Sequence, residues 1–461
     1  MIKINKIVLN NFRFFRDDKK HNSFELNGEN MLLYGENGSG KSSIFKAFEF
    51  LAQTDIDREV FLKSQNIFST QKPFIEFSLD NNREIIIDED NLDNNYSYLE
   101  ALEIYKPMLE YKNLLKIHYQ TDKSKEEINI YDMLRELFSE YPIDENKILG
   151  DIKNPNIYYD KLKDIINSKV LDDINHFLKK FDDTFHIREF FFDMEFTEDG
   201  KVEFIVNVKI DFMDNELNIY HHFLNEARLS ALAIAIHFAI IRNVSDRLDS
   251  SSLKLLILDD LLMSLDMSNR LSLITLLKEY FYDFQIFLFT HDKNFFEILK
   301  DKMRWKSYEI YVDSKDLEKP FIKKSLNYFE SAKKYFEEYD YPACANYLRK
   351  EVERIKKIKE GEETFINSDK KIFKKLKNMI LSTDLSDIKN RDKICGKLIG
   401  FKDGFEDDRD SGVEIDLRDI KSITDRILNP QSHDDTLRPL YKKELKEAIE
   451  IIQTIRDNIK L

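Results

Sequence analysis

A glycine-rich turn near the N-terminus carries the residues best suited to chemistry. Its sequence, G-E-N-G-S-G-K-S, fits the phosphate-binding pattern G-x-x-x-x-G-K-[ST]. Glycines let successive backbone N–H groups point at a polyphosphate, while the lysine adds positive charge and the last serine can ligate Mg²⁺. The turn therefore predicts a bound nucleoside triphosphate with Mg²⁺. The predicted contacts are Gly35, Asn37, Gly38, Ser39, Gly40, Lys41, Ser42 and Ser43.

Two adjacent carboxylates supply the acidic partner that such a turn needs. The apolar stretch 253–258 runs directly into Asp259 and Asp260. Phosphoryl transfer to water needs a metal ion and a group that orients the attacking water. We therefore assign Ser42 and Asp259 to the metal and Asp260 to the water, as a catalytic residue. A second apolar stretch, 284–289, leads into His291.

Strands and helices must position these side chains. Apolar–polar alternation or short apolar runs predict strands, and apolar residues at three- and four-residue spacing predict helices. The predicted strands are 2–10, 23–26, 31–34, 74–79, 83–87, 190–196, 202–212, 217–221, 253–258, 284–289 and 305–312, and the clearest helices are 43–51 and 226–241. Each candidate chemical group thus follows the end of a predicted strand.

The pattern divides the chain into four parts. Residues 1–95 form a first α/β lobe, 96–186 a helical insertion, 187–316 a second lobe and 317–461 a separate all-helical domain. At 1.5 Å per residue, even two equal helices from the insertion reach only about 50–60 Å, which excludes a long coiled-coil arm. The predicted fold class is therefore an α/β P-loop head with a short helical insertion and a separate all-α C-terminal domain.

Bulk composition narrows the functional classes. A chain of 461 residues is too long for one core, and its net charge of −15 argues against a surface coated for non-specific nucleic-acid binding. We expect no membrane association, because no apolar run approaches the roughly 20 residues of a membrane span and the chain opens as a strand. Two cysteines, Cys344 and Cys395, fit a reducing cytoplasm.

The order of these motifs resembles the ABC-type ATPase heads of SMC and RecF-like proteins. The opening sequence L-N-N-F-R, ending at Arg13, is similar to the start of that family, and Ser264-Leu265-Asp266 is similar to its D-loop. The resemblance implies ATP and Mg²⁺ as cofactors and heads that form a homodimer or higher oligomer around ATP. It further implies that Arg13 lies near the phosphates, that Asp266 contacts nucleotide, and that His291 senses the γ-phosphate and is catalytic.

Two positions depart from the family pattern. The family signature Leu-Ser-Gly-Gly is replaced by the segment 224–230, L-N-E-A-R-L-S, in which Asn225 is the predicted donor to nucleotide. Asp260 stands where the family has Glu, and its shorter reach predicts slow, switch-like turnover. For the glutamine of the family's Q-loop, both Gln65 and Gln71 are candidates.

The segments 225–230 and 258–266 also resemble ATPases of bacterial anti-phage systems such as Septu, PrrC and RloC. That resemblance implies a head that senses infection and controls a nuclease or toxin, either fused or separate, and here we expect the effector as a separate subunit. Two alternatives stay open. One is a RecF-like ATPase of DNA repair or chromosome maintenance, and the other is an ATP-regulated ribonuclease acting on tRNA.

The C-terminal domain carries the residues for the ribonuclease alternative. Arg426 and His433 are separated by six residues, which resembles the R-x(4–6)-H motif of HEPN domains, and Arg349 and Glu353 share one helix face. His433 could act as general acid or base while Arg426 or Arg349 stabilises the phosphorane. The competing interpretation is a docking domain in which Arg349 and Glu353 form an ordinary helical ion pair.

Overall fold

The computed structural model describes most of the chain. The described residues are 2–19, 21–118, 127–144, 147–196, 202–217, 219–246, 252–261, 265–313, 315, 319–362 and 442–458. They fall into two compact units, Met1–Ser325 and Leu326–Leu461. Each unit has its own hydrophobic core.

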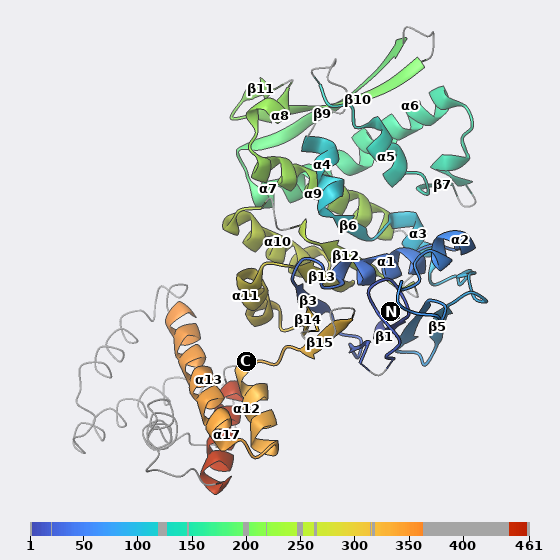
Figure 1. Cartoon of the computed structure of the whole chain (residues 1–461). Helices are drawn as coiled ribbons and strands as arrows, with labels where there is room; N and C mark the ends of the chain where they lie inside the picture. The colour runs from blue at the N-terminus through green and yellow to red at the C-terminus, as the bar shows by residue number, and fades with distance from the viewer. Residues whose placement is uncertain are drawn as a thin grey trace. The chain divides into compact units, whose positions relative to one another are not determined.

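A six-stranded, mostly parallel sheet forms the centre of the first unit (Figure 1). Its order is β15 (Pro320–Lys324), β14 (Lys306–Val312), β3 (Met31–Gly35), β13 (Gln285–Thr290), β12 (Leu255–Asp259) and β6 (Met108–Glu110). Only β15 is antiparallel to its neighbour. Every residue of β3, β12 and β13 is buried, as continuous apolar strands of a sheet covered on both faces should be.

Helices that follow the strands cover this sheet. Helix α1 (Lys41–Leu51) packs against β12, and α11 (Lys293–Met303) packs against β3. The register places Asp259 opposite Phe289, and Thr290 opposite Tyr34. The carboxyl ends of β3, β12 and β13 therefore meet at one edge, where ligands bind in open α/β sheets.

A four-stranded antiparallel sheet lies beside the first. It has the order β2 (Ser23–Glu25), β1 (Ile4–Asn10), β4 (Phe74–Leu79) and β5 (Glu84–Ile87), and the short helix α2 (Arg58–Leu62) precedes β4. The fully buried Gln285 joins the two sheets, because its side chain bonds both the N–H and the carbonyl of Ile4 at 2.7 and 2.8 Å. The predicted strands 74–79 and 83–87 are confirmed and form an antiparallel hairpin, the second beginning at Glu84.

The insertion lies between the two halves of the head sequence. Its described elements are α3 (Glu100–Tyr105), β6, α4 (Tyr111–His118), α5 (Tyr131–Leu137), β7 (Pro142–Asp144), β8 (Lys147–Ile148), a 3₁₀ turn (Leu149–Asp151), α6 (Pro155–Ile165), a π-helical turn (Ile166–Val170) and α7 (Leu171–Phe181). A third sheet follows, with the order β11 (Asn215–Leu217), β10 (Val202–Phe212) and β9 (Phe185–Phe196). Figure 1 shows this hairpin beside the insertion helices.

Helix α9 (Glu226–Ser245) packs against α3, α4 and α7 of the insertion and against α10 (Met267–Tyr280). It is apolar on almost every side, with Ala and Ile closely spaced along its sequence, and nearly all of its residues from Leu229 onward are buried. It is also the one described helix whose length and composition would suit a membrane, but 78% of its most apolar window is buried inside the protein.

The structure confirms the predicted fold class and corrects several local predictions. The insertion is not purely helical, because it contributes β6 to the edge of the main sheet. Residues 320–324 form β15 rather than a helix, and the first unit continues to Ser325 instead of ending at 316. The predicted strand 217–221 is wrong at its end, where α8 (Tyr220–Phe223) begins.

The described part of the second unit is helical. It consists of α12 (Tyr328–Glu337), α13 (Tyr341–Glu362) and α17 (Lys442–Asn458) around an apolar core. Glu351 is fully buried in this unit and is bonded by Arg354 at 2.8 and 2.9 Å and by Arg456. Cys344 is buried as well, and this burial raises the pKa of its thiol to about 12.

Candidate functional site

The glycine-rich turn joins β3 directly to α1. Gly38 and Gly40 have φ of 82° and 108°, a region that L side chains rarely adopt. A Cβ on Gly35 would lie 2.4 Å from the Ser39 hydroxyl and 2.5 Å from Ile310, so this position has no room for a side chain. The three predicted glycines therefore have physical reasons to be glycine.

The N-terminus of α1 is open. Gly40 occupies the cap position without a side-chain hydrogen bond, and the first turn has no acidic residue. The positive end of the helix dipole and its N–H groups are thus available to an anion. Ser42 is exposed at this end, whereas Ser43 is buried and its hydroxyl accepts a 3.4 Å bond from the N–H of Phe14.

Lys41 is held at the centre of the site. Its side chain is only 6% exposed, and its Nζ donates to the carbonyls of Gly35 at 2.7 Å and Glu36 at 3.4 Å. The same Nζ lies 3.7 Å from Oδ2 of Asp260. The turn, the lysine and the end of β12 therefore form one cluster.

Asp260 joins this cluster to His291. One carboxylate oxygen of Asp260 accepts the backbone N–H of His291 at 3.0 Å and lies 2.8 Å from its Nδ1. Asp260 has φ of 50°, a left-handed conformation in which Asp and Asn are tolerated better than most residues. The sequence prediction that Asp260 and His291 share the site is consistent with this geometry.

Asp259 lies next to the cluster but inside the protein. It is 8% exposed, and its Oδ1 is buried without a hydrogen-bond partner among the described residues. Burial, together with the neighbouring Asp260, raises the pKa of its carboxyl to about 7. A bound cation would give this unpartnered oxygen a ligand and would stabilise the buried negative charge. The environment of Asp259 therefore fits the assignment of Asp259 and Ser42 to Mg²⁺.

Within the described ranges, no group of three or more His, Cys, Asp or Glu side chains is arranged to hold a metal. A Mg²⁺ site of the P-loop type does not need one. Magnesium keeps several waters and takes one or two protein oxygens together with phosphate oxygens, and when bound it neutralises phosphate charge. The chemistry of Ser42 and Asp259 therefore suits Mg²⁺ delivered with a nucleotide.

Arg13 lies close to the glycine-rich turn through its neighbour. The backbone N–H of Phe14 donates to the hydroxyl of Ser43. The ring of Phe14 also packs on Gly40, since a Cβ added to Gly40 would lie 2.9 Å from a ring carbon. Arg13 itself is exposed, with φ of 50°. The two glutamine candidates lie near this segment: Gln65 bridges to Phe12, and Gln71 bonds to Asn11 at 3.3 Å and Asp17 at 3.1 Å.

Asn225 and Asp266 both occupy helix caps. The side chain of Asn225 accepts the N–H of Arg228 at the start of α9, and Asp266 accepts the N–H of Asn269 at the start of α10. Asn225 is exposed and Glu226 lies in the first turn of its helix. Ser264 lies outside the described residues, so the structure places only Leu265 and Asp266 of the predicted D-loop.

Arg270 was missed by the sequence interpretation. Its Nε donates to the carbonyl of Leu265 at 2.9 Å, and its Nη1 donates to Asp292 at 2.5 Å. It thereby ties the segment after β12 to the segment after β13, where His291 lies. The available signal was its position four residues after Asp266.

The ribonuclease candidates are divided. Arg349 and Glu353 lie on α13 and form an exposed ion pair at 3.0 Å, the intrahelical arrangement that was the competing interpretation. Arg426 and His433 lie outside the described residues. The described contacts therefore bring no catalytic group together in the second unit.

Comparison with known proteins agrees with a P-loop ATPase head. Residues 6–191 match the family model described as an AAA domain. This match covers the glycine-rich turn and the whole insertion. The fold and the site thus have the features of a P-loop nucleotide-binding head. No curated protein matches the chain.

Solved structures similar to this chain include SMC heads and RecF. The SMC head domain from Thermotoga maritima is 12% identical, with a TM-score of 0.38 and coverage of 70% of this chain and 99% of its own. The Smc head from Pyrococcus furiosus bound to the C-terminal domain of ScpA is 15% identical, with a TM-score of 0.44 and coverage of 74% and 100%. RecF with ATP is 15% identical, with a TM-score of 0.42 and coverage of 70% and 98%.

Proposed function

We propose that this chain is an ATP-hydrolysing head of the ABC type, similar to SMC and RecF heads. In this proposal, paired heads control a nuclease or toxin in cytoplasmic anti-phage defence. The observation that carries the ATPase assignment is the cluster of Lys41, Asp260 and His291 beside the open N-terminus of α1. The defence role is supported by the sequence resemblance of segments 225–230 and 258–266 and by the short insertion.

The described geometry suggests how the residues act. Phosphate oxygens would replace the carbonyls of Gly35 and Glu36 as acceptors for Lys41. Asp260 accepts from the backbone N–H of His291, so both side chains are held at the carboxyl edge of the sheet. Asp260 would orient the attacking water, and the other ring nitrogen of His291 would meet the γ-phosphate.

A second copy would complete the site. We propose that Asn225 and Asp266 of one head face nucleotide held by the other head. Because both side chains cap their own helices in the single chain, dimerisation has to redirect at least part of their hydrogen bonding. Slow turnover follows from this requirement and from the short reach of Asp260.

ATP turnover and association state test the ATPase proposal together. We expect purified protein to release phosphate from ATP slowly and to sediment as a dimer when hydrolysis is blocked, for example with Asp260→Asn and ATP. Lys41→Ala should abolish both effects. Lys46→Ala, on the same helix but paired with Glu49 at 2.6 Å, is the matched control. Full turnover in Lys41→Ala would refute the proposal.

The defence role has a separate test. A nuclease or toxin encoded next to this chain should co-purify with it, and phage protection should require both proteins and Lys41. Turnover that rises with duplex DNA, without any effector, would instead favour a RecF-like repair function. Cleavage of tRNA that disappears in His433→Ala would favour the ribonuclease function.

A further inference from the structure

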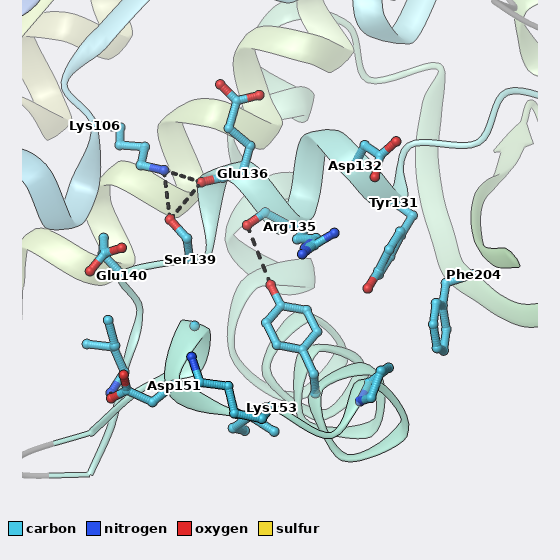
Figure 2. A pocket seen from close by; sticks show the side chains of 15 residues that line it. Lys106, Tyr131, Asp132, Arg135, Glu136, Ser139, Glu140, Asp151, Lys153 and Phe204 are labelled. Atoms are coloured by element: carbon cyan, nitrogen blue, oxygen red, sulfur yellow. Dashed lines mark hydrogen bonds between the residues drawn. The ribbon is translucent and has the colours of Figure 1, made fainter. Parts of the chain in front are cut away.

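The insertion contains a cavity that the proposed ATPase site does not use. Its volume is about 760 Å³, within the range of small-molecule sites, and it opens between α5, the turn at 148–153 and the start of α6. Figure 2 shows Tyr131 and Phe204 at one end of the cavity and Glu140 and Asp151 at the other. Arg135 lies on the aromatic side, and Lys153 lies between the two ends.

Four acidic side chains line this cavity; Glu136 and Asp151 are engaged by the protein itself, Asp132 lies on the aromatic side and Glu140 at the other end. Glu136 bonds to Lys116 at 2.7 Å, and Asp151 accepts the backbone N–H of Ile148 at 3.1 Å. Burial, reinforced by Glu103, raises the pKa of the Glu140 carboxyl. These contacts weaken the repulsion that an anionic ligand would meet.

Three cationic side chains line the cavity, and Lys106 is held by Ser139. Among the described residues, neither Arg135 nor Lys153 has a carboxylate within ion-pair distance, although both line the cavity. Arginine and lysine are the side chains that bind phosphate groups best. The cavity therefore offers two cations to an outside anion.

The remaining walls add two further kinds of contact. The rings of Tyr131 and Phe204 lie 5.4 Å apart at 32° and form an aromatic wall. Nucleobases stack on such rings. Carboxylates at the other end can accept hydrogen bonds from ribose hydroxyls. The aromatic rings suit a base, the carboxylates suit ribose hydroxyls, and the two cations suit one phosphate. A nucleoside monophosphate combines these three groups.

We propose that this cavity binds a nucleoside monophosphate, at a site separate from the glycine-rich turn. Lys106 lines it, with its Nζ bonded to the hydroxyl of Ser139 at 2.8 Å and to the carbonyl of Glu136. The next residue, Pro107, accepts a 2.8 Å bond from the N–H of Ile257 in β12. The strand that follows, β6, places Glu110 opposite Asp259.

Through this connection a bound monophosphate regulates the ATPase, a second step that rests on the proposed function. A change in the position of Lys106 reaches β12 through the adjoining peptide and β6. Because Asp259 is the last residue of β12, the link ends at the metal ligand. The expected consequence is a severalfold change in ATP turnover when the cavity is filled.

Direct binding is measured by calorimetric titration of the full chain with AMP, GMP, CMP and UMP. We expect at least one to bind to the wild type and to Lys41→Ala, because the contacts lie outside the glycine-rich turn. The double variant Arg135→Gln/Lys153→Gln should lose at least tenfold in affinity. Lys161→Gln, an exposed lysine on α6 outside the cavity, is the matched control and should bind normally.

Several outcomes overturn the proposal. They are the absence of binding by all four monophosphates, binding lost in Lys41→Ala but kept in the double variant, and competition by inorganic phosphate as strong as that by the nucleotide. Circular dichroism checks that the double variant is folded. If binding follows the prediction while ATP turnover is absent, the site stands and the proposed ATPase function fails; if turnover is present but does not respond, only the regulatory step fails.

Discussion

Two helix N-termini in this protein, those of α1 and α9, are prepared for different partners. At α1 the cap residue is a glycine, the first turn has no acidic residue, and Lys41 lies beside N–H groups that no side chain caps. At α9 the side chain of Asn225 already caps the helix, and Glu226 adds negative charge. The first terminus can take a phosphate as it stands, whereas the second must exchange an internal bond for an external one. This difference predicts strong binding by one chain and slow, association-dependent hydrolysis.

Removing the lysine tests the open terminus and should have the largest effect. Lys41→Ala deletes the cation that meets the phosphates, so we expect ATP turnover to fall by about a thousandfold, roughly 4 kcal/mol of lost transition-state stabilisation. Phosphate release and nucleotide binding are the measurements, with Lys46→Ala as control. A partial loss below tenfold would mean that the α1 terminus provides most of the phosphate binding, whereas full turnover would refute the ATPase proposal.

The end of β12 should come second. Asp260→Asn preserves the left-handed backbone, because Asn also tolerates positive φ, but removes the charge. We expect kcat to fall by about a hundredfold while nucleotide binding persists, as for loss of a general base. Equal losses in binding and turnover would instead show that Asp260 mainly positions Lys41.

Arg270 tests whether the two loops must be held together. Although burial opposes it, hydrogen bonds from the N–H of Phe295 and from Arg270 hold the pKa of Asp292 below its ordinary value. Arg270→Gln should lower kcat about tenfold, some 1.4 kcal/mol, with little change in KM. Arg270→Lys can keep one of the two hydrogen bonds, so its kcat should lie between those of the wild type and Arg270→Gln. Unchanged kcat with lower thermal stability would indicate a purely structural role.

The N-terminus of α9 is tested by substitutions of Asn225 that keep the helix cap. Asp and Ser cap helices about as well as Asn, so Asn225→Asp and Asn225→Ser should leave stability unchanged, whereas Asn225→Ala should cost about 1 kcal/mol. Only Asp places a negative charge before a partner's phosphate, so its turnover should fall severalfold below that of the Ser variant. Equal turnover of the two variants would remove Asn225 from the nucleotide site.

The interior of α9 predicts a smaller, pH-dependent effect. Burial lowers the pKa of His237 to about 4, below its unfolded value, with Lys116 and Glu136 as nearby charges of opposite effect. The unfolded chain therefore binds more protons below pH 6.5, and stability falls as pH falls. Between pH 7.5 and 6 the loss should be about 1 kcal/mol. Denaturant titrations of the wild type and His237→Gln measure it, and the variant should show a flatter profile.

Local chemistry explains which features were predictable from sequence. The glycine-rich turn, β3, β12 and β13 carry their signals within a few residues, because fully buried strands are continuously apolar. β6 and β15 are short and partly exposed, so only their partners in the sheet make them strands. Asp266 was recognised by motif, but the role of Arg270 depends on Asp292, which reaches it only in the fold. The cavity has the same origin, since its walls come from separate segments.

The position of β3 has a consequence for how the chain is made. Among the described strands, β3 pairs only with β13 and β14, which begin about 250 and about 275 positions after it. A ribosome adding about 5–20 residues per second needs on the order of 10–50 s to supply them. Until then β3, the strand that leads into the glycine-rich turn, has no partner strands in the sheet. A nascent chain can therefore acquire nucleotide only when the first unit is nearly finished, which couples ligand capture to the completion of that unit.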